Sequence, residues 1–230
     1  MIQMLDESVF NSYIETVFNY SKGIMGDVDS NLKVVYTPLH GTGLEPVRTL
    51  LGRLGFALDV VEQQAVADPG FSTVKVPNPE DKQAFTLALE LARKSDADIV
   101  MATDPDSDRI GVFEKESGDY LSFNGNQIGI ALSYFLLNKM SEKNILPDNG
   151  LIIKTIVSTD MIKSIAADYG VSVQETLTGF KFIGEKIEYY EKNKEKEFIL
   201  GFEESYGYLA GTHARDKDAV VAAALICMLA

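Results

Sequence analysis

The chain has 230 residues, of which 46% are hydrophobic and 24% are charged, and its formal net charge is −13. This composition is typical of a globular protein and argues against a disordered or fibrous chain. The excess of carboxylates repels nucleic-acid phosphates and no basic stripe offsets it, so we expect no nucleic-acid partner.

Other composition features point to an intracellular protein. No apolar run reaches the roughly 18 to 20 residues that a membrane span needs, and the first residues lack the pattern of a signal peptide. We therefore expect a cytoplasmic protein with no membrane partner. The single cysteine, Cys227, lies in an apolar run and is expected to be a buried thiol.

Short β-branched runs alternate with helical periodicity along the chain. Residues 1–20 predict a helix, and the Gly-, Asp- and Ser-rich residues 22–31 predict a linker. In the part that follows, strands are predicted at residues 32–36, 57–61, 98–103, 110–113 and 120–123, and helices at residues 45–54, 80–94 and 126–140. After a polar stretch, strands are predicted at residues 151–156, 171–175 and 198–202, and helices at residues 160–169, 180–193 and from residue 218 onward.

Repeated strand–helix–strand units of this length predict an α/β fold with a mainly parallel sheet and helices on both faces. The strands at residues 110–113 and 120–123 are too close for a crossover, which predicts a hairpin at one edge. Two consecutive three-layer α/β/α domains with mainly parallel mixed sheets are therefore expected. The predicted division is a lead-in helix and linker at residues 1–29, a first domain at residues 30–147 and a second at residues 148–230.

Three carboxylates, Asp104, Asp106 and Asp108, stand at alternate positions directly after a predicted apolar strand, in the sequence DPDSDR. Their mutual repulsion is relieved by a hard cation, most simply Mg²⁺, and the alternative interpretation is a solvated acidic turn. An EF-hand is excluded because Arg109 and Lys115 occupy the positions of its Gly and Glu. A phosphatase of the haloacid-dehalogenase type also has an acidic loop after a strand. Asp108 stands where that motif has Thr or Val, so the match is incomplete and this alternative stays open.

Three further loops follow predicted strands, where ligands of open α/β sheets bind. The sequence TPLHGTG at residues 37–43 is either an anion-binding loop or a tight turn in which His40 bonds locally. The loop TLTGFK at residues 176–181 places a hydroxyl, a glycine and an amine together, which suits a phosphosugar. The loop GFEESYG at residues 201–207 offers carboxylates that suit sugar hydroxyls.

Taken together and in this order, these loops resemble those of the α-D-phosphohexomutases, the phosphoglucomutase and phosphomannomutase superfamily. DPDSDR resembles the metal-binding signature, and FEESYG resembles the sugar-recognition loop of the form Glu-x-Ser-x-Gly. YTPLHGTG, PNPED and LTGFKFIG are similar to supporting motifs of the second and third domains. The resemblance covers residues 32–230.

The resemblance implies that this chain is the second and third of four domains, entered by a helix from the first. It also implies an isomerase that interconverts hexose 1-phosphate and hexose 6-phosphate through a phosphoserine and a sugar bisphosphate. Carried over residue by residue, the metal ligands for Mg²⁺ would be Asp104, Asp106 and Asp108. The catalytic residues would be Arg109 and Lys154, and the substrate-binding residues would be Thr178, Gly179, Glu203 and Ser205.

Two parts of the family pattern are missing from this sequence. No serine is followed by His-Asn, as in the phosphoserine loop, and the Arg-x-Ser-Gly-Thr phosphate clamp is absent. The chain also begins inside a predicted helix and stops at Ala230 in an apolar segment with no helix cap. We therefore expect an inactive fragment whose partners are a glucose or mannose phosphate and flanking domains of the same polypeptide. A stand-alone module that binds metal or a phosphosugar is the alternative.

Overall fold

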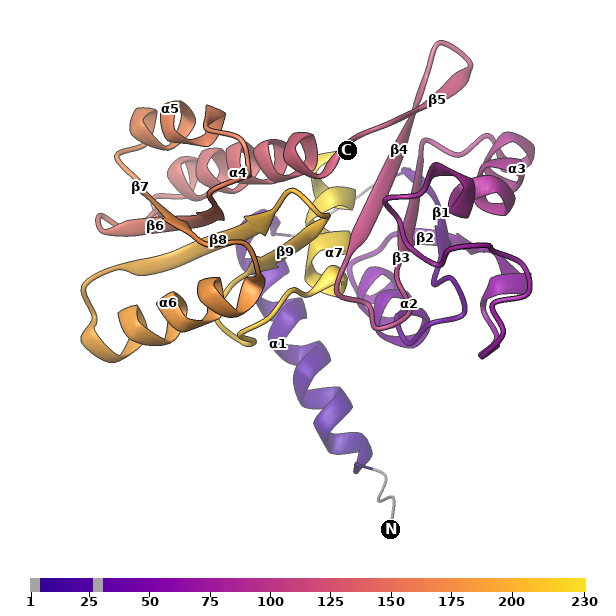
Figure 1. Cartoon of the computed structure of the whole chain (residues 1–230), viewed down its shortest axis with the longest axis horizontal. Helices are drawn as coiled ribbons and strands as arrows, with labels where there is room; N and C mark the ends of the chain where they lie inside the picture. Colours follow the sequence, from indigo (N-terminus) through magenta and orange to yellow (C-terminus); the bar gives the residue numbers. More distant parts are fainter. Residues whose placement is uncertain (1–4, 27–30) are drawn as a thin grey trace.

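The computed structural model describes residues 5–26 and 31–230 of the chain. Two sheets lie side by side, and helix α7 (Ala219–Leu229) lies between them (Figure 1). Each sheet has helices packed on both of its faces. The predicted α/β class, with three layers in each half, is therefore confirmed.

The first sheet has five strands in the order β2-β1-β3-β4-β5. These strands are β1 (Lys33–Thr37), β2 (Ala57–Val60), β3 (Ile99–Thr103), β4 (Ile110–Glu116) and β5 (Asp119–Ser122). β1 pairs in parallel with β2 and β3, whereas β4 and β5 form the antiparallel hairpin predicted at one edge. Because side chains alternate along a strand, β1 buries Val34 against helix α2 (Leu44–Arg53) and Val35 against helix α3 (Thr86–Ser95).

The second sheet has four strands in the order β7-β6-β8-β9. They are β6 (Gly150–Thr155), β7 (Ser172–Thr176), β8 (Glu197–Glu203) and β9 (Gly207–Ala210). The first three are parallel, and β9 runs antiparallel to β8. Helix α6 (Phe180–Asn193) covers one face, and helix α5 (Met161–Asp168) lies on the other with α4 (Gly125–Glu142) and α7. Strand β9 is not among the predicted strands, and only its first residue, Gly207, belongs to a loop that the sequence singled out.

Two predicted helices differ from the observed ones by more than two residues at one end. Helix α1 (Glu7–Met25) continues through the first part of the predicted linker, because Ser21 and Ile24 are buried in the core. Residues 1–4 of the predicted helix and residues 27–30 of the predicted linker lie outside the described residues. The helix predicted from residue 80 begins as a 3-10 turn (Lys82–Phe85), and its α-helical part is α3.

Helix α7 joins the cores of the two halves. Its residues from Ala219 to Met228 are all buried, which fits a helix that is apolar on every side. It contacts α2 and β4 of the first half, β9 and α4 (Gly125–Glu142), which pack with the second sheet, and helix α1. The largest hydrophobic cluster therefore runs through both sheets without interruption.

Helix α4 follows the first sheet in sequence but packs on the second. It contacts α5 and β8 as well as α7 and α1. The boundary predicted between residues 147 and 148 stays a prediction. None of the helices within residues 5–26 and 31–230 has both the length and the apolar character that a membrane span requires.

Candidate functional site

The candidate site lies where the loop after β3 meets the turn between β8 and β9. We call residues 104–109 the metal loop and residues 203–207 the sugar loop, after the two predictions. The backbone N–H of Ile110 donates to the carbonyl of Tyr206 at 3.0 Å, and Arg109 forms an antiparallel bridge with Gly207. Two segments nearly one hundred residues apart in sequence are thus joined by their backbones.

The three aspartates of the metal loop converge on one point. Asp104, Asp106 and Asp108 each offer a carboxylate oxygen, and these oxygens all lie within 4.8 Å of one another. Asp104 is buried, and its Oδ1 accepts hydrogen bonds from the backbone N–H groups of Asp108 at 3.0 Å and Arg109 at 2.9 Å. Asp106 is exposed and Asp108 is half-buried, so the cluster is open to solvent on one side.

Electrostatics show that this arrangement suits a cation. Burial raises the pKa of Asp104 to about 7; its hydrogen bond from the Arg109 backbone opposes this rise, and the charges of Asp108 and Asp106 add to it. A hard divalent cation would relieve the repulsion, and three carboxylate oxygens are the ligands that Mg²⁺ prefers. The donor set therefore fits the predicted ion.

The side chain of Arg109 lies over the acidic cluster. Its Nη1 donates to Oε1 of Glu80 at 2.5 Å, and its Nε lies 3.7 Å from Asp104 and 3.8 Å from Asp108. Glu80 belongs to the PNPED motif that the sequence singled out, and the structure gives this motif a role in holding the guanidinium. A fixed positive charge is thereby placed beside the predicted metal ligands.

Lys217 is a site residue that the sequence did not predict. Its Nζ lies 3.0 Å from Oδ2 of Asp108 and 3.0 Å from Oδ1 of Asp216. The aliphatic stem crosses Gly207 so closely that a Cβ there would lie 2.2 Å from Lys217 Cδ. Burial lowers the pKa of Lys217, but the hydrogen bonds to Asp108 and Asp216 outweigh it and raise the pKa overall. No pattern in the neighbouring sequence marks Lys217 as a site residue, because its partner Asp108 belongs to the loop after β3 in the first sheet.

The glycines of the HGTG sequence form a support for the metal loop. A Cβ at Gly41 would lie 2.3 Å from Cα of Pro105, and the N–H of Thr42 donates to the carbonyl of Pro105 at 2.8 Å. A Cβ at Gly43 would lie 2.7 Å from Oγ of Ser107. The first sheet can hold the metal loop this tightly only because these two positions lack side chains.

His40 bonds within its own neighbourhood. Its Nδ1 lies 2.8 Å from the carbonyl of Val66 and its Nε2 lies 2.7 Å from Oγ1 of Thr73. Of the two interpretations of this loop, these contacts agree with the tight turn rather than with an anion-binding loop.

The sugar loop is held by contacts within the second sheet. Glu203 is buried, and its Oε1 accepts a hydrogen bond from the N–H of Gly179 at 2.9 Å. Burial raises the pKa of Glu203, while the hydrogen bond from Gly179 opposes the rise. The structure thus brings Glu203 and Gly179 together, with Ser205 half-buried two residues on and Thr178 exposed beside Gly179.

Glu204, the second carboxylate of the GFEESYG loop, accepts hydrogen bonds from hydroxyl groups of the protein itself and anchors this loop. Its Oε2 accepts hydrogen bonds from Oγ1 of Thr155 at 2.9 Å and from Oγ of Ser158 at 3.3 Å. A Cβ at Gly125 would lie 2.0 Å from the carbonyl oxygen of Glu204, so the start of helix α4 supports the loop from the other side.

Lys154 is fully buried at the end of β6. Its Nζ donates to the carbonyl of Ser158 at 2.9 Å and to Oε1 of Glu175 at 2.8 Å, and it lies 3.0 Å from Oδ1 of Asp160. All of these partners belong to the second half of the chain, so the structure does not bring Lys154 to the metal loop. Its predicted catalytic role stays a prediction.

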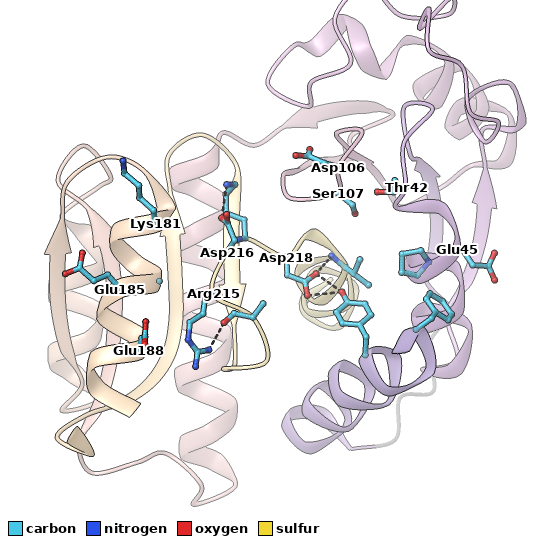
Figure 2. Close-up of a pocket in the computed structure, with 17 residues that line it drawn as sticks. Thr42, Glu45, Asp106, Ser107, Lys181, Glu185, Glu188, Arg215, Asp216 and Asp218 are labelled. Carbon is cyan, nitrogen blue, oxygen red and sulfur yellow. Dashed lines mark hydrogen bonds and ion pairs between the residues drawn. The ribbon is translucent and has the colours of Figure 1, made fainter. Parts of the chain in front are cut away.

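A cleft of about 1030 Å³ opens beside the metal loop. Figure 2 shows Asp106 and Ser107 at one end of it, with side chains of α6 on one side and Thr42 and Glu45 on the other. Its lining carries both signs of charge, from Lys181, Arg215 and Lys217 and from Asp106, Glu185, Glu188 and Asp216. The volume is at the upper end of the range found for small-molecule sites.

Comparison with known proteins agrees with this geometry. The family model "Phosphoglucomutase/phosphomannomutase, alpha/beta/alpha domain II" matches residues 11–118, and the model of domain III matches residues 124–230. These models divide the chain ahead of helix α4, earlier than the predicted boundary.

Two phosphoglucomutases illustrate the similarity. The enzyme of Staphylococcus haemolyticus strain JCSC1435 is 41% identical over 225 residues, which covers 96% of this chain and 39% of that protein. The enzyme of Staphylococcus aureus strain USA300 is 41% identical over 228 residues, which covers 98% of this chain and 40% of that protein. The chain therefore spans well under half the length of these curated relatives.

A solved structure supports the fold. The putative phosphomannomutase from Thermus thermophilus superposes with a TM-score of 0.76 at 21% identity, covering 100% of this chain and 48% of that one. Because the two family models match nearly the whole sequence, in the order in which its two sheets occur, the chain belongs to the phosphoglucomutase/phosphomannomutase family.

Proposed function

We propose that this chain is the metal-binding and sugar-binding part of a phosphohexomutase, which interconverts hexose 1-phosphate and hexose 6-phosphate. The observation that carries the proposal is the junction of the two loops. The acidic cluster and Arg109 come from one sheet and Glu203 from the other, and the backbone contacts of Arg109 and Ile110 with the sugar loop join them.

The metal loop would act on the phosphoryl group. Asp104, Asp106 and Asp108 would hold Mg²⁺, whose charge offsets the negative charge on a phosphoryl group in transfer. Arg109 lies beside these carboxylates with its guanidinium held by Glu80, so it adds a second positive charge at the same place. This positioning costs no rearrangement when the transition state forms.

The sugar loop would orient the hexose. Hydroxyl groups are donors that need fixed acceptors, and Glu203 is a carboxylate held in place by the N–H of Gly179. Ser205 and Thr178 supply hydroxyl groups near it. In such a reaction the sugar presents first one end and then the other to the phosphoryl donor, so this loop must accept two orientations.

The phosphoserine donor of the proposed reaction would come from outside this sequence, which has no serine followed by His-Asn. The intermediate would be a sugar bisphosphate that forms when the serine gives its phosphoryl group to a free hydroxyl. Lys154, at the end of β6 in the second sheet, would be the catalytic lysine that the resemblance implies. On this proposal the chain alone shows no isomerisation of glucose 1-phosphate, and turnover by the chain alone would contradict it.

Thermal unfolding with and without Mg²⁺ tests the metal site. At one hundred times its dissociation constant a ligand adds about 2.7 kcal/mol, or roughly 5–10 °C in melting temperature for a chain of this size. We expect this rise for the wild type and for Asp148→Ala, a control that removes a carboxylate from an exposed loop position. We expect none for Asp106→Ala.

Equal rises in Asp106→Ala and the wild type would contradict the proposal. Hydrolysis of a simple phosphomonoester that is lost in Asp104→Asn would instead support the phosphatase alternative.

A further inference from the structure

Asp218 is a buried carboxylate that the proposed chemistry does not use. It lies at the start of helix α7, and four donors surround it. Its oxygens accept hydrogen bonds from Tyr13 Oη at 2.8 and 3.0 Å, from His213 Nε2 at 2.6 Å, and from the backbone N–H groups of Val220 at 2.8 Å and Val221 at 3.2 Å.

These donors explain how a charge is tolerated in this place. A buried carboxylate is costly unless its oxygens are paired, and the two backbone donors also cap helix α7. Burial raises the pKa of Tyr13, so its hydroxyl keeps its proton and remains a donor. Tyr13 belongs to helix α1 and His213 to the loop after β9, so Asp218 joins three separate segments.

The residues on either side of Asp218 both contact the metal loop. Lys217 pairs with Oδ2 of Asp108 at 3.0 Å, and the N–H of Ala219 donates to the carbonyl of Ser107 at 3.1 Å. Figure 2 shows Asp218 between the metal-loop residues Asp106 and Ser107 and helix α1. A displacement of Asp218 would therefore change both contacts with the metal loop.

We propose that Asp218 is a positioning residue for the metal loop, and that Tyr13 acts through it, so that the affinity of the acidic cluster for Mg²⁺ depends on helix α1. The inference rests on the Mg²⁺ site proposed above and adds two residues outside that site, Asp218 and Tyr13, that affect its affinity for Mg²⁺. Lys217 is the link, because it orients Asp108 as an outer partner orients a metal-binding carboxylate.

If Tyr13 and Asp218 only stabilised the fold, the effect of Tyr13→Phe on Mg²⁺ affinity would be different. Loss of the Tyr13 hydroxyl would then lower the free energy of unfolding but leave the Mg²⁺ affinity of the folded protein unchanged. Affinity measured on folded protein therefore separates the two roles, and it needs no enzymatic activity.

The test is calorimetric titration of MgCl₂ into the chain and its variants. Lys217→Met is expected to raise the dissociation constant about tenfold, the lower end of the range for outer-shell partners. Tyr13→Phe is expected to raise it about threefold, a coupling of ordinary size. The matched control is Tyr20→Phe, on the same helix, because within residues 5–26 and 31–230 its hydroxyl makes no hydrogen bond. The control should bind like the wild type.

The double variant Tyr13→Phe/Lys217→Met checks the route. If Tyr13 acts through Lys217, the double variant binds Mg²⁺ as Lys217→Met does, whereas independent effects would multiply and overturn the proposed route. Should Tyr13→Phe fail to fold, His213→Gln removes the neighbouring imidazole donor, and the same rise in the dissociation constant is expected.

Two negative results have different meanings. If the wild type binds no Mg²⁺, the proposed metal site is wrong and the inference falls with it. If the wild type binds Mg²⁺ and Tyr13→Phe binds as tightly as Tyr20→Phe, the metal site stands and the inference about Asp218 is wrong.

Discussion

Replacing Gly41 by alanine should weaken the packing of the HGTG loop against the metal loop. The new Cβ would lie 2.3 Å from Cα and 2.5 Å from the carbonyl oxygen of Pro105, and both are backbone atoms that cannot rotate away. Ordinary contact begins at 3.4 Å, so the two loops would have to separate by about 1 Å. That movement weakens the hydrogen bond from the N–H of Thr42 to Pro105, which is now 2.8 Å long.

The expected loss combines two effects. Overpacking of a tight contact costs about 1–3 kcal/mol and a weakened hydrogen bond about 1 kcal/mol, so we expect the free energy of unfolding to fall by about 3 kcal/mol. For a chain of this length the melting temperature should fall by roughly 6–12 °C. The Mg²⁺ affinity should fall as well, because Pro105 separates two of the predicted ligands.

Urea denaturation of Gly41→Ala and Gly52→Ala provides the assay. Gly52 lies in helix α2 with nothing within 4 Å of an added Cβ, so alanine there should stabilise the protein by about 0.5–1 kcal/mol. The free energy of unfolding should therefore fall in Gly41→Ala and rise in Gly52→Ala. A Gly41→Ala variant within about 0.5 kcal/mol of the wild type would refute the idea that the HGTG loop supports the metal loop.

Two other predictions concern buried charges. Burial raises the pKa of Asp104 from 3.8 to about 7. Between these two pH values the folded protein therefore keeps a proton on Asp104 that the unfolded chain has lost. As the pH rises from 3.8 to about 7, this group lowers the free energy of unfolding. The same proton competes with Mg²⁺, so titration should show roughly tenfold weaker binding near pH 6 than near pH 8, and pH-independent binding would contradict this. Lys154→Met should lower the free energy of unfolding by about 2–3 kcal/mol, because it removes a charged donor from the buried carbonyl of Ser158. Its control in urea denaturation is Lys163→Met, which pairs with the same two carboxylates from an exposed position and should change little; equal losses would show that burial of Lys154 is not the cause.

Helix α6 shows what the sequence could predict. Its observed bounds, Phe180–Asn193, are those predicted, because local features mark both the start and the buried face. Gly179 has φ 115°, a conformation that side chains disfavour, and Phe180, Ile183 and Ile187 recur at helical spacing and are buried. The metal loop was predictable for a similar reason, since its three carboxylates are neighbours in sequence.

The missed features depend on contacts between distant segments. Strand β9 has only four residues and is stabilised by its pairing with β8. Its sequence is too short to show the alternation of apolar and polar residues by which a strand is predicted. Lys217 became a site residue through Asp108, which lies on the other sheet. Residues 22–25 have a linker-like composition, yet Ile24 is buried and the helix continues. In each case tertiary packing outweighed local preference.

The backbone bridge between the metal loop and the sugar loop limits how such an enzyme could move. Hinge opening between the two sheets would break the bond from Ile110 to Tyr206, the bond from Ala219 to Ser107 and the ion pair of Lys217 at once. In the reaction proposed above, a hexose would turn end over end between two phosphoryl transfers, and separating these loops to give it room would break all three contacts. On that proposal, the freedom for the rotation would come from the ligand itself or from a movement that leaves this bridge intact.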